Sequence, residues 1–226
     1  MIQEPPKKIL QKEVDKQISL IMDKHSYDRD AIDVAILDFG GQYTHLIKRK
    51  LEELDINVEI LPHQTTHQQL LDFHVKAVIL GGGPNSVYEP DAPRCDLDIL
   101  KSRKLKILGI CYGHQLIAHQ LDGQVMKGLK SEYGTAELII DDPKDPLFQD
   151  IPPRIQVWAS HTDEVQQPPP GGKVIAHSAN CVIEAYNIQN RIWGVQFHPE
   201  VSQTEYGYEL LENFTVKIGK CYRIQL

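Results

Sequence analysis

The sequence predicts an α/β fold with a mostly parallel central sheet, helices on both faces, and antiparallel strands added in the C-terminal half. Three observations support this prediction. The first half of the chain alternates short apolar runs with amphipathic helical patterns, whereas the second half has strand-like runs separated by turns. The 226 residues, 41% of them hydrophobic, are also enough to form one domain with a sizeable core.

The first half is predicted to repeat a strand–helix unit. A βαβα order implies a parallel sheet with helices on both faces. Reactive groups in such a sheet gather at the carboxyl ends of the strands. The expected strands span residues 33–37, 58–61, 75–80 and 106–110, and the expected helices span 42–54, 68–73, 96–102 and 114–121.

Turn sequences separate the strand-like segments of the second half, among them Asp141-Asp142-Pro143 and the proline- and glycine-rich run at 168–172. We expect these strands either to extend the sheet edge in antiparallel fashion or to form a small second sheet. A final helix near 204–217 would cover one face. The strand-like segments are 135–140, 155–158, 173–177, 182–187 and 192–197.

Residues 1–30 differ from the rest because they are charged and lack strand patterns. Their apolar residues recur at roughly helical spacing, which predicts an amphipathic helix. Three roles stay open for this helix: covering its own domain, docking to a partner, or forming a frayed tail. We therefore expect an N-terminal extension, residues 1–30, before one main domain, residues 31–226. The apolar residues are Ile9, Leu10, Val14, Ile18, Ile21 and Met22.

The composition argues against several classes of protein. A net charge of −7 and a pI near 5.8 do not suit nonspecific nucleic-acid binding, which needs a basic surface. No apolar run approaches the roughly 20 residues that cross a bilayer, and no signal peptide is visible. Four cysteines without a Cys-x-x-Cys spacing indicate reduced thiols and a cytoplasmic protein. Three of them, Cys95, Cys181 and Cys221, are expected to be structural.

Ten histidines raise the question of a metal site. His63, His67 and His74 are close in sequence, but the first of them falls in a predicted loop, and no ligand set converges. We therefore expect no metal. His114 and His161 are better functional candidates. The alternative for His114 is packing on its helix, and His161 is expected to make either a partner contact or a local hydrogen bond.

Cys111 lies at the bend of a predicted strand–turn–helix, in the segment Gly109-Ile110-Cys111-Tyr112-Gly113. Glycines two residues before and after it let backbone segments approach where a Cβ would clash. The same geometry in hydrolases exposes a strained nucleophile, and the start of a helix favours a thiolate. Cys111 is therefore a candidate nucleophile, the alternative being a small buried apolar residue.

A second motif near the C-terminus supplies a candidate base, in Gln196-Phe197-His198-Pro199-Glu200. Residues two apart in an extended segment face the same side, so Glu200 is expected to orient His198. Together with Cys111 they would form a triad in which a base activates a nucleophile. By itself a His-x-Glu pattern is weak, because such a pair is more often found at the surface.

A glycine-rich segment, Gly81-Gly82-Gly83-Pro84-Asn85-Ser86, follows an apolar strand. Such a turn leaves backbone N–H groups free to face an anion. It lacks the Gly-Lys-Ser/Thr ending of a P-loop and the spaced glycines of a dinucleotide site. An oxyanion hole beside Cys111 fits better, and a flexible turn is the alternative.

These motifs, together with segments 36–44 and 158–165, resemble the class I, or triad, glutamine amidotransferases. The resemblance covers about residues 32–214. Within that family the segments are most similar to the branch of GMP synthetase glutaminases. The family likeness agrees with the α/β fold predicted above.

The resemblance implies a role for each matching residue. Cys111 would attack the glutamine carboxamide, His198 would transfer protons, and Glu200 would orient His198. The backbone N–H groups of Gly83 and Tyr112 would form the oxyanion hole. The amino-acid end of glutamine would be held by Gln115 and by the backbones of Gly81, Ser160 and Asp163.

Three positions depart from the family pattern, and none removes a triad member. Gly41 stands where serine is common, and Asn85 occupies a variable position in the glycine-rich segment. Thr162 stands where glycine is common, so it could narrow the glutamine pocket or alter its closing.

The resemblance also implies a partner. Ammonia would pass to an ATP-pyrophosphatase (synthetase) domain or subunit that uses ATP and Mg to activate xanthosine monophosphate (XMP), whereas the glutaminase itself needs no cofactor. The Ser-Gly-Gly-x-Asp-Ser loop of such a partner does not occur in this sequence. We therefore expect the partner to be either a separate subunit or a further domain of a longer chain. The alternatives are an amidotransferase for another synthetase, a stand-alone γ-glutamyl hydrolase, and a non-catalytic regulatory module on the same fold.

Overall fold

The computed structural model describes residues 7–24 and 32–221 of the chain. A nine-stranded sheet forms its centre, in the order β2-β1-β3-β4-β9-β8-β7-β5-β6. Strands β1 (Val34–Asp38), β2 (Val58–Pro62), β3 (Ala77–Leu80), β4 (Lys106–Ile110) and β9 (Ile192–Val195) are parallel to their neighbours in that half.

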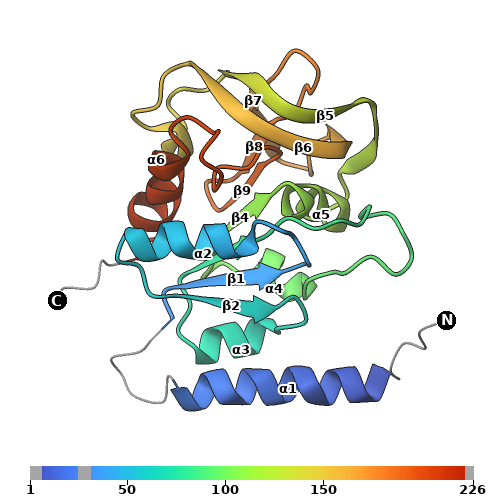
Figure 1. Ribbon diagram of the computed structural model, residues 1–226, viewed down its shortest axis with the longest axis vertical. Coiled ribbons are helices and arrows are strands. Elements are labelled where there is room, and N and C mark those ends of the chain that lie inside the picture. Colours follow the sequence, from blue (N-terminus) through green and yellow to red (C-terminus); the bar gives the residue numbers. More distant parts are fainter. Residues whose placement is uncertain (1–6, 25–31, 222–226) are drawn as a thin grey trace.

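The second half of the sheet is antiparallel and continues from β9. Of the two arrangements expected from the sequence, the structure therefore has the extended single sheet (Figure 1). Its strands are β8 (Ala185–Ile188), β7 (Gly172–His177), β5 (Gln124–Ile140) and β6 (Arg154–Gln167).

Helices cover both faces of the parallel half, as the sequence predicts. Successive residues of a strand point to opposite faces, so Ile36 joins one apolar cluster and Leu37 the other. The first cluster contains α2 (Thr44–Glu53), α6 (Gly207–Glu212) and the π-helical η2 (Asn213–Ile218). The second contains α3 (His67–Asp72), α4 (Leu97–Lys101) and α5 (Tyr112–Gln120). The 3₁₀ helix η1 (Pro146–Phe148) packs in the first cluster.

Helix α1 (Lys7–Lys24) lies along α3 (Figure 1). Its Val14 and Ile18 are buried in the same cluster as Leu70 of α3. The side chains of Ile9, Leu10, Ile21 and Met22, and the expected domain boundary near residue 30, lie outside the described residues.

Several predicted boundaries were wrong. Strands β5 and β6 are much longer than the expected 135–140 and 155–158, because they pair with each other along most of their length. Strand β8 begins at Ala185 instead of 182, and β9 ends at Val195 instead of 197. The last helix begins at Gly207 instead of 204, after a turn at Tyr206, which has φ of 55°.

Among the described residues, no helix is long and apolar enough to span a membrane.

Candidate active site

Cys111 lies between the end of β4 and the first turn of α5, in a backbone conformation that is unusual for a side-chain-bearing residue. Its φ is 52° and its ψ is −103°. Such conformations cost of order 1–3 kcal/mol and persist where the surrounding structure holds them. Here the Cys111 N–H donates to the Val195 carbonyl at 2.9 Å, which ties the bend to β9.

The two glycines that flank Cys111 have the role that the sequence predicts. A Cβ on Gly113 would lie 2.2 Å from the Leu80 carbonyl oxygen, and a Cβ on Gly109 would lie 2.5 Å from the Gly113 backbone. Both contacts are with backbone atoms, which cannot rotate away. Only glycine therefore lets α5 begin this close to β3 and β4.

His198 and Glu200 come together although neither belongs to a strand. His198 Nδ1 lies 2.7 Å from Glu200 Oε1, and both side chains are buried. The His198 N–H donates to the Trp158 carbonyl at 3.0 Å, and the Thr204 hydroxyl donates to the His198 carbonyl at 2.7 Å. These bonds to β6 and to the following turn hold the segment beyond β9 in place, whereas the sequence pattern predicts that strand geometry would do so.

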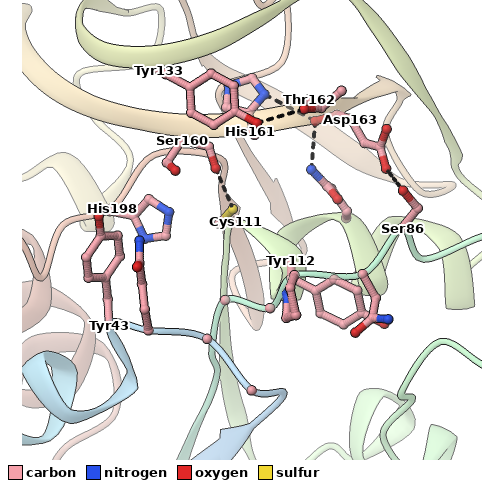
Figure 2. A pocket seen from close by; sticks show the side chains of 18 of the residues that line it. Tyr43, Ser86, Cys111, Tyr112, Tyr133, Ser160, His161, Thr162, Asp163 and His198 are labelled. Carbon is pink, nitrogen blue, oxygen red and sulfur yellow. Dashed lines mark hydrogen bonds between the residues drawn. The ribbon is translucent and has the colours of Figure 1, made fainter. Parts of the chain in front are cut away.

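The imidazole of His198 lies beside the Cys111 sulfur (Figure 2). Burial lowers the pKa of His198, but the contacts with Cys111 and Glu200 outweigh burial and raise it to about 10. Since Nδ1 faces Glu200, Nε2 is the ring nitrogen available to the sulfur. The site therefore favours a charged imidazolium next to the thiol. In this arrangement the Cys111 thiol donates to the Ser160 carbonyl at 3.7 Å.

The glycine-rich segment borders the same space. A methyl group on Gly82 would lie 3.4 Å from His198 Cε1 and 4.0 Å from Cys111 Cβ. Gly83 and Tyr112 both line the pocket. Tyr112 is the first residue of α5, and N–H groups in a first helical turn have no acceptor within the helix.

A pocket of about 560 Å³ opens over Cys111 and His198 (Figure 2). It brings together residues from β4–α5, β6, the glycine-rich segment and the turn before α2. Its lining includes Cys111, Tyr112, Gln115, Ser160, Asp163, His198 and Gly83 from the sequence prediction. The three positions that depart from the family pattern, Gly41, Asn85 and Thr162, also line the pocket.

Glu200 contacts His198 but does not line the pocket, and neither does Gly81. The Gly81 N–H donates to the Leu37 carbonyl at 3.1 Å, and its carbonyl accepts from the Gly113 N–H at 3.1 Å. Both backbone groups are therefore occupied, and Gly81 serves to join β1 to α5. A carbonyl oxygen can accept a second hydrogen bond, so the expectation that the Gly81 backbone holds glutamine stays a prediction.

Gln115 and Asp163 are linked across the floor of the pocket. Gln115 Nε2 donates to the Asp163 carbonyl at 2.7 Å and to Gln196 Oε1 at 3.1 Å. The Asp163 carboxylate accepts bonds from the hydroxyls of Ser86 and, at 3.0 Å, Tyr88. The glycine-rich segment is thus attached to β6 through the Asp163 side chain.

Several residues of the site lie in or beside the sequence motifs, but the motifs assign them no role. Ser86 and Tyr88 anchor Asp163, and Tyr43 packs edge-on against His198 with 5.0 Å between ring centroids. Hydroxyl and aromatic residues of this kind carry no distinctive spacing. Their place in the site becomes clear only in the folded chain, where segments far apart in sequence lie together.

Two of the residues that depart from the family pattern, Gly41 and Thr162, make contacts that shape the pocket. A Cβ on Gly41 would lie 2.4 Å from the Gly82 carbonyl oxygen, so glycine allows the two loops to touch. The Thr162 hydroxyl is 2.9 Å from the exposed Tyr133 hydroxyl, at the rim of the pocket. Thr162 therefore bonds to β5 at the pocket rim.

The remaining histidines and cysteines singled out from the sequence do not join the triad. His161 makes a local hydrogen bond from Nδ1 to the Asp163 carbonyl at 3.2 Å. His114 is fully buried against Tyr186, and burial lowers its pKa to about 3. Among the described residues, His63, His67 and His74 do not converge as a ligand group. Like Cys111, the remaining cysteines are free and buried, namely Cys95, Cys181 and Cys221.

Comparisons with known proteins agree on one family. Residues 35–218 match the family described as glutamine amidotransferase class-I. A protein named GMP synthase [glutamine-hydrolyzing] from Caldanaerobacter subterraneus is 43% identical over 189 residues, which cover 83% of this chain and 36% of the relative. One of the same name from Crocosphaera subtropica is 44% identical over 197 residues, 87% of this chain and 36% of the relative. The chain thus spans about a third of the length of these relatives.

Solved structures show the same fold. A protein from Thermoplasma acidophilum, described as a candidate GMP synthase subunit, superposes with a TM-score of 0.74 at 30% identity, over 83% of this chain and 93% of that one. A glutamine amidotransferase from Thermotoga maritima superposes with a TM-score of 0.66 at 18% identity, over 83% of this chain and 97% of that one. From its sequence match, its relatives and its fold, the chain belongs to the class-I glutamine amidotransferase family.

Proposed function

We propose that this chain is the glutaminase part of a GMP synthase. It hydrolyses glutamine through a thioester on Cys111 and passes ammonia to an ATP-pyrophosphatase partner that aminates XMP to GMP. The observation that carries this proposal is that Cys111 and His198 line one pocket, with Glu200 bonded to His198. The names of the relatives, of which the chain spans about a third, support the choice of partner.

The first half of the reaction forms the thioester. With the thiol proton held on His198 as an imidazolium, the Cys111 thiolate adds to the side-chain carbonyl carbon of glutamine. The Gly83 and Tyr112 N–H groups stabilise the negative charge that develops on the carbonyl oxygen. The tetrahedral intermediate then collapses as the C–N bond breaks, and the imidazolium of His198 gives its proton to the departing ammonia.

The second half releases glutamate. Neutral His198 removes a proton from a water molecule, which attacks the thioester carbon. The C–S bond breaks, and the proton returns to the Cys111 sulfur. Glu200 stabilises the imidazolium that forms twice in the cycle and keeps Nε2 directed at the sulfur. This half of the reaction needs no metal or organic cofactor, and ATP and Mg would bind to the partner.

The substrate would lie over Cys111 with its amino-acid end toward Gln115, Ser160 and Asp163. The Asp163 carbonyl already accepts from Gln115, so it is one fixed point in this wall of the pocket. The hydroxyls of Ser86 and Tyr88 hold the Asp163 carboxylate, which steadies the same wall.

The test is glutamate release by the purified chain, alone and with its ATP-pyrophosphatase partner, ATP, magnesium and XMP. We expect low turnover alone and a marked increase with the complete mixture. Equal turnover in both would contradict the coupling, and fast turnover alone would identify a stand-alone hydrolase. Failure of a glutamine-analogue electrophile to label Cys111 would contradict catalysis itself. We also propose that this reaction takes place in the cytoplasm.

A further inference from the structure

A second cluster, made of one histidine and two glutamates that could bind a metal ion, lies beside the pocket. Glu132 is on β5, His161 is on β6, and Glu184 directly precedes β8. Their candidate ligand atoms, one imidazole nitrogen and two carboxylate oxygens, all lie within 4.8 Å of one another. His161 borders the pocket, whereas Glu184 is completely buried.

The polar atoms of this cluster lack the hydrogen bonds that buried groups normally have. Neither carboxylate oxygen of Glu184 has a partner, although the residue is 0% exposed. The Ser178 hydroxyl lies near Glu184 but does not meet hydrogen-bond geometry. His161 Nε2 and Glu132 Oε2 also have no hydrogen-bond partner. Unpaired buried polar atoms cost free energy, so their concentration at one place points to a missing ligand.

The orientation of His161 suits a cation. Its Nδ1 faces the Asp163 carbonyl, which can only accept, so Nδ1 carries the proton. In the neutral ring with this tautomer, Nε2 presents a lone pair. That lone pair faces Glu132 Oε2 at 3.3 Å. Two acceptors at this distance need either a proton or a metal cation between them.

The neighbouring groups strengthen the same requirement. Asn180 Nδ2 donates to Glu132 Oε1 at 2.9 Å, which leaves Oε2 directed at His161. Glu164 adds a third carboxylate near Glu132 and Glu184. Among the described residues, no lysine or arginine forms an ion pair with any of these three glutamates.

The distances select a type of ion. Zinc binds imidazole nitrogen and carboxylate oxygen at about 2.0–2.1 Å in tetrahedral geometry, which places two ligand atoms about 3.3–3.4 Å apart. The observed separation of His161 Nε2 and Glu132 Oε2 is 3.3 Å. Calcium and magnesium prefer ligand sets made only of oxygen, so the imidazole favours zinc.

We propose that Glu132, His161 and Glu184 form a zinc-binding site, with water as the fourth ligand. The Asp163 carbonyl and Asn180 would orient the imidazole and one carboxylate, as outer partners do in known metal sites. The ion would tie together β5, β6 and the segment before β8. It would thereby stiffen the stretch from Ser160 to Asp163 that forms the pocket wall, without touching the substrate.

The experiment uses the full chain carrying Cys111→Ala, because a thiol beside an imidazole would itself bind zinc. After chelator treatment, Zn²⁺ is titrated against a chromogenic competitor. We expect one Zn²⁺ per chain and a rise in melting temperature. Adding Glu184→Gln should weaken the binding at least about tenfold and remove the thermal shift. Co²⁺ in the same site should show the intense visible absorption of tetrahedral coordination.

Two variants of the same background serve as controls. His177→Gln removes an exposed imidazole that lies 2.8 Å from Asp141, an ordinary surface pair. Glu164→Gln removes a nearby carboxylate that is not a ligand in the cluster. Neither should abolish the one-to-one binding. If Glu184→Gln does not fold by circular dichroism, Glu132→Gln replaces it.

Three results would overturn the proposal: no stoichiometric Zn²⁺ binding, unchanged affinity in the Glu184→Gln variant, or loss of binding in His177→Gln. The first would mean that a proton, not a metal, occupies the cluster. Because these chains lack the nucleophile, the outcome does not depend on whether the proposed glutaminase function is correct.

Discussion

His198 Nδ1 lies 2.7 Å from Glu200 Oε1, and the two side chains belong to residues that are only 4% and 2% exposed. A buried charge pair of this kind is weak evidence for stability but strong evidence for orientation, because each partner would be costly to leave alone. The pair fixes which ring nitrogen faces Cys111. The following predictions test that arrangement.

Cys111→Ala should abolish glutamine hydrolysis and leave folding nearly unchanged, because the thiol acts by covalent chemistry. Glutamate release and circular dichroism measure the two effects. Cys95→Ala is the matched control, since it also removes a buried thiol, one that donates to Gln120 Oε1 at 3.2 Å. Near-normal glutaminase rates in the Cys111→Ala chain would refute the nucleophile assignment.

His198→Ala should reduce glutamine hydrolysis nearly as much as loss of the nucleophile, whereas Glu200→Ala should be milder. The reason is that proton transfer is indispensable, but orientation is partly supplied by the bonds of the His198 backbone to Trp158 and Thr204. Values of kcat and KM for glutamine, measured with the activated complex, give the order. A Glu200→Ala chain less active than the His198→Ala chain would reverse it.

The His198 imidazole should stay protonated at pH 8. Burial works against this, but contacts with Cys111 and Glu200 raise the pKa to about 10 from an ordinary 6.5. Histidine NMR signals, followed from pH 5 to pH 10, measure the titration. In Cys111→Ala the pKa should fall. An imidazole that titrates near pH 6.5 in the parent chain would contradict the geometry.

The raised pKa of His198 also stabilises the folded state at low and neutral pH. The folded state binds the His198 proton more tightly than the unfolded state, so the contribution is complete below pH 6.5 and disappears as the pH rises through about 10. Each unit of pKa shift corresponds to about 1.4 kcal/mol. Denaturant unfolding at pH 6, 8 and 10 measures the free energy of unfolding of both chains. The parent should be more stable than Glu200→Gln at pH 6, and this difference should shrink as the pH rises to 10. A constant difference across this range would count against the ion pair.

Gly113→Ala should destabilise the fold by about 1–3 kcal/mol or more, because the new methyl group would lie 2.2 Å from the Leu80 carbonyl oxygen. The melting temperature should fall by roughly 2–4 °C for each kcal/mol in a chain of this size. Gly82→Ala is the matched control for stability, since its Cβ would make an ordinary contact at 3.4 Å. Equal melting temperatures for the two variants would show that the bend at Cys111 is less tightly packed than these distances imply.

Tyr88→Phe should raise the KM for glutamine about fivefold with little change in kcat. It removes one of two hydroxyl bonds to the Asp163 carboxylate, worth about 1 kcal/mol, while leaving the triad untouched. Tyr208→Phe is the control, because that hydroxyl donates to the Glu53 carbonyl on α2. A Tyr88→Phe chain with lower kcat and unchanged KM would assign Tyr88 a different role.

Much of the parallel half could be predicted from the sequence. Its strands are short, continuous apolar runs, and its helices have a 3.6-residue period, so local pattern and buried environment agree. The Cys111 bend could also be predicted, since Gly109 and Gly113 fall within five residues of sequence and mark close backbone approaches, of Gly109 to Gly113 and of Gly113 to Leu80. The triad members could be named from their motifs, although His198 and Glu200 are held by turns instead of a strand.

The antiparallel half was harder to predict. Strands β5 and β6 continue through polar residues such as Lys127 and Glu132, where cross-strand hydrogen bonds sustain a ribbon that hydrophobic periodicity does not reveal. The occupied backbone of Gly81 also depends on pairing with segments elsewhere in the chain.

The sequence by itself determined the family, the α/β class and the residue types that do chemistry, because those depend on local spacing. Tertiary structure alone decided that Glu132, His161 and Glu184 meet, and that Ser86 and Tyr88 reach Asp163. Such contacts join residues that are tens of positions apart, and a local pattern carries no information about the distance between them. Burial then sets their charge states, since desolvation acts only after the chain has folded around them.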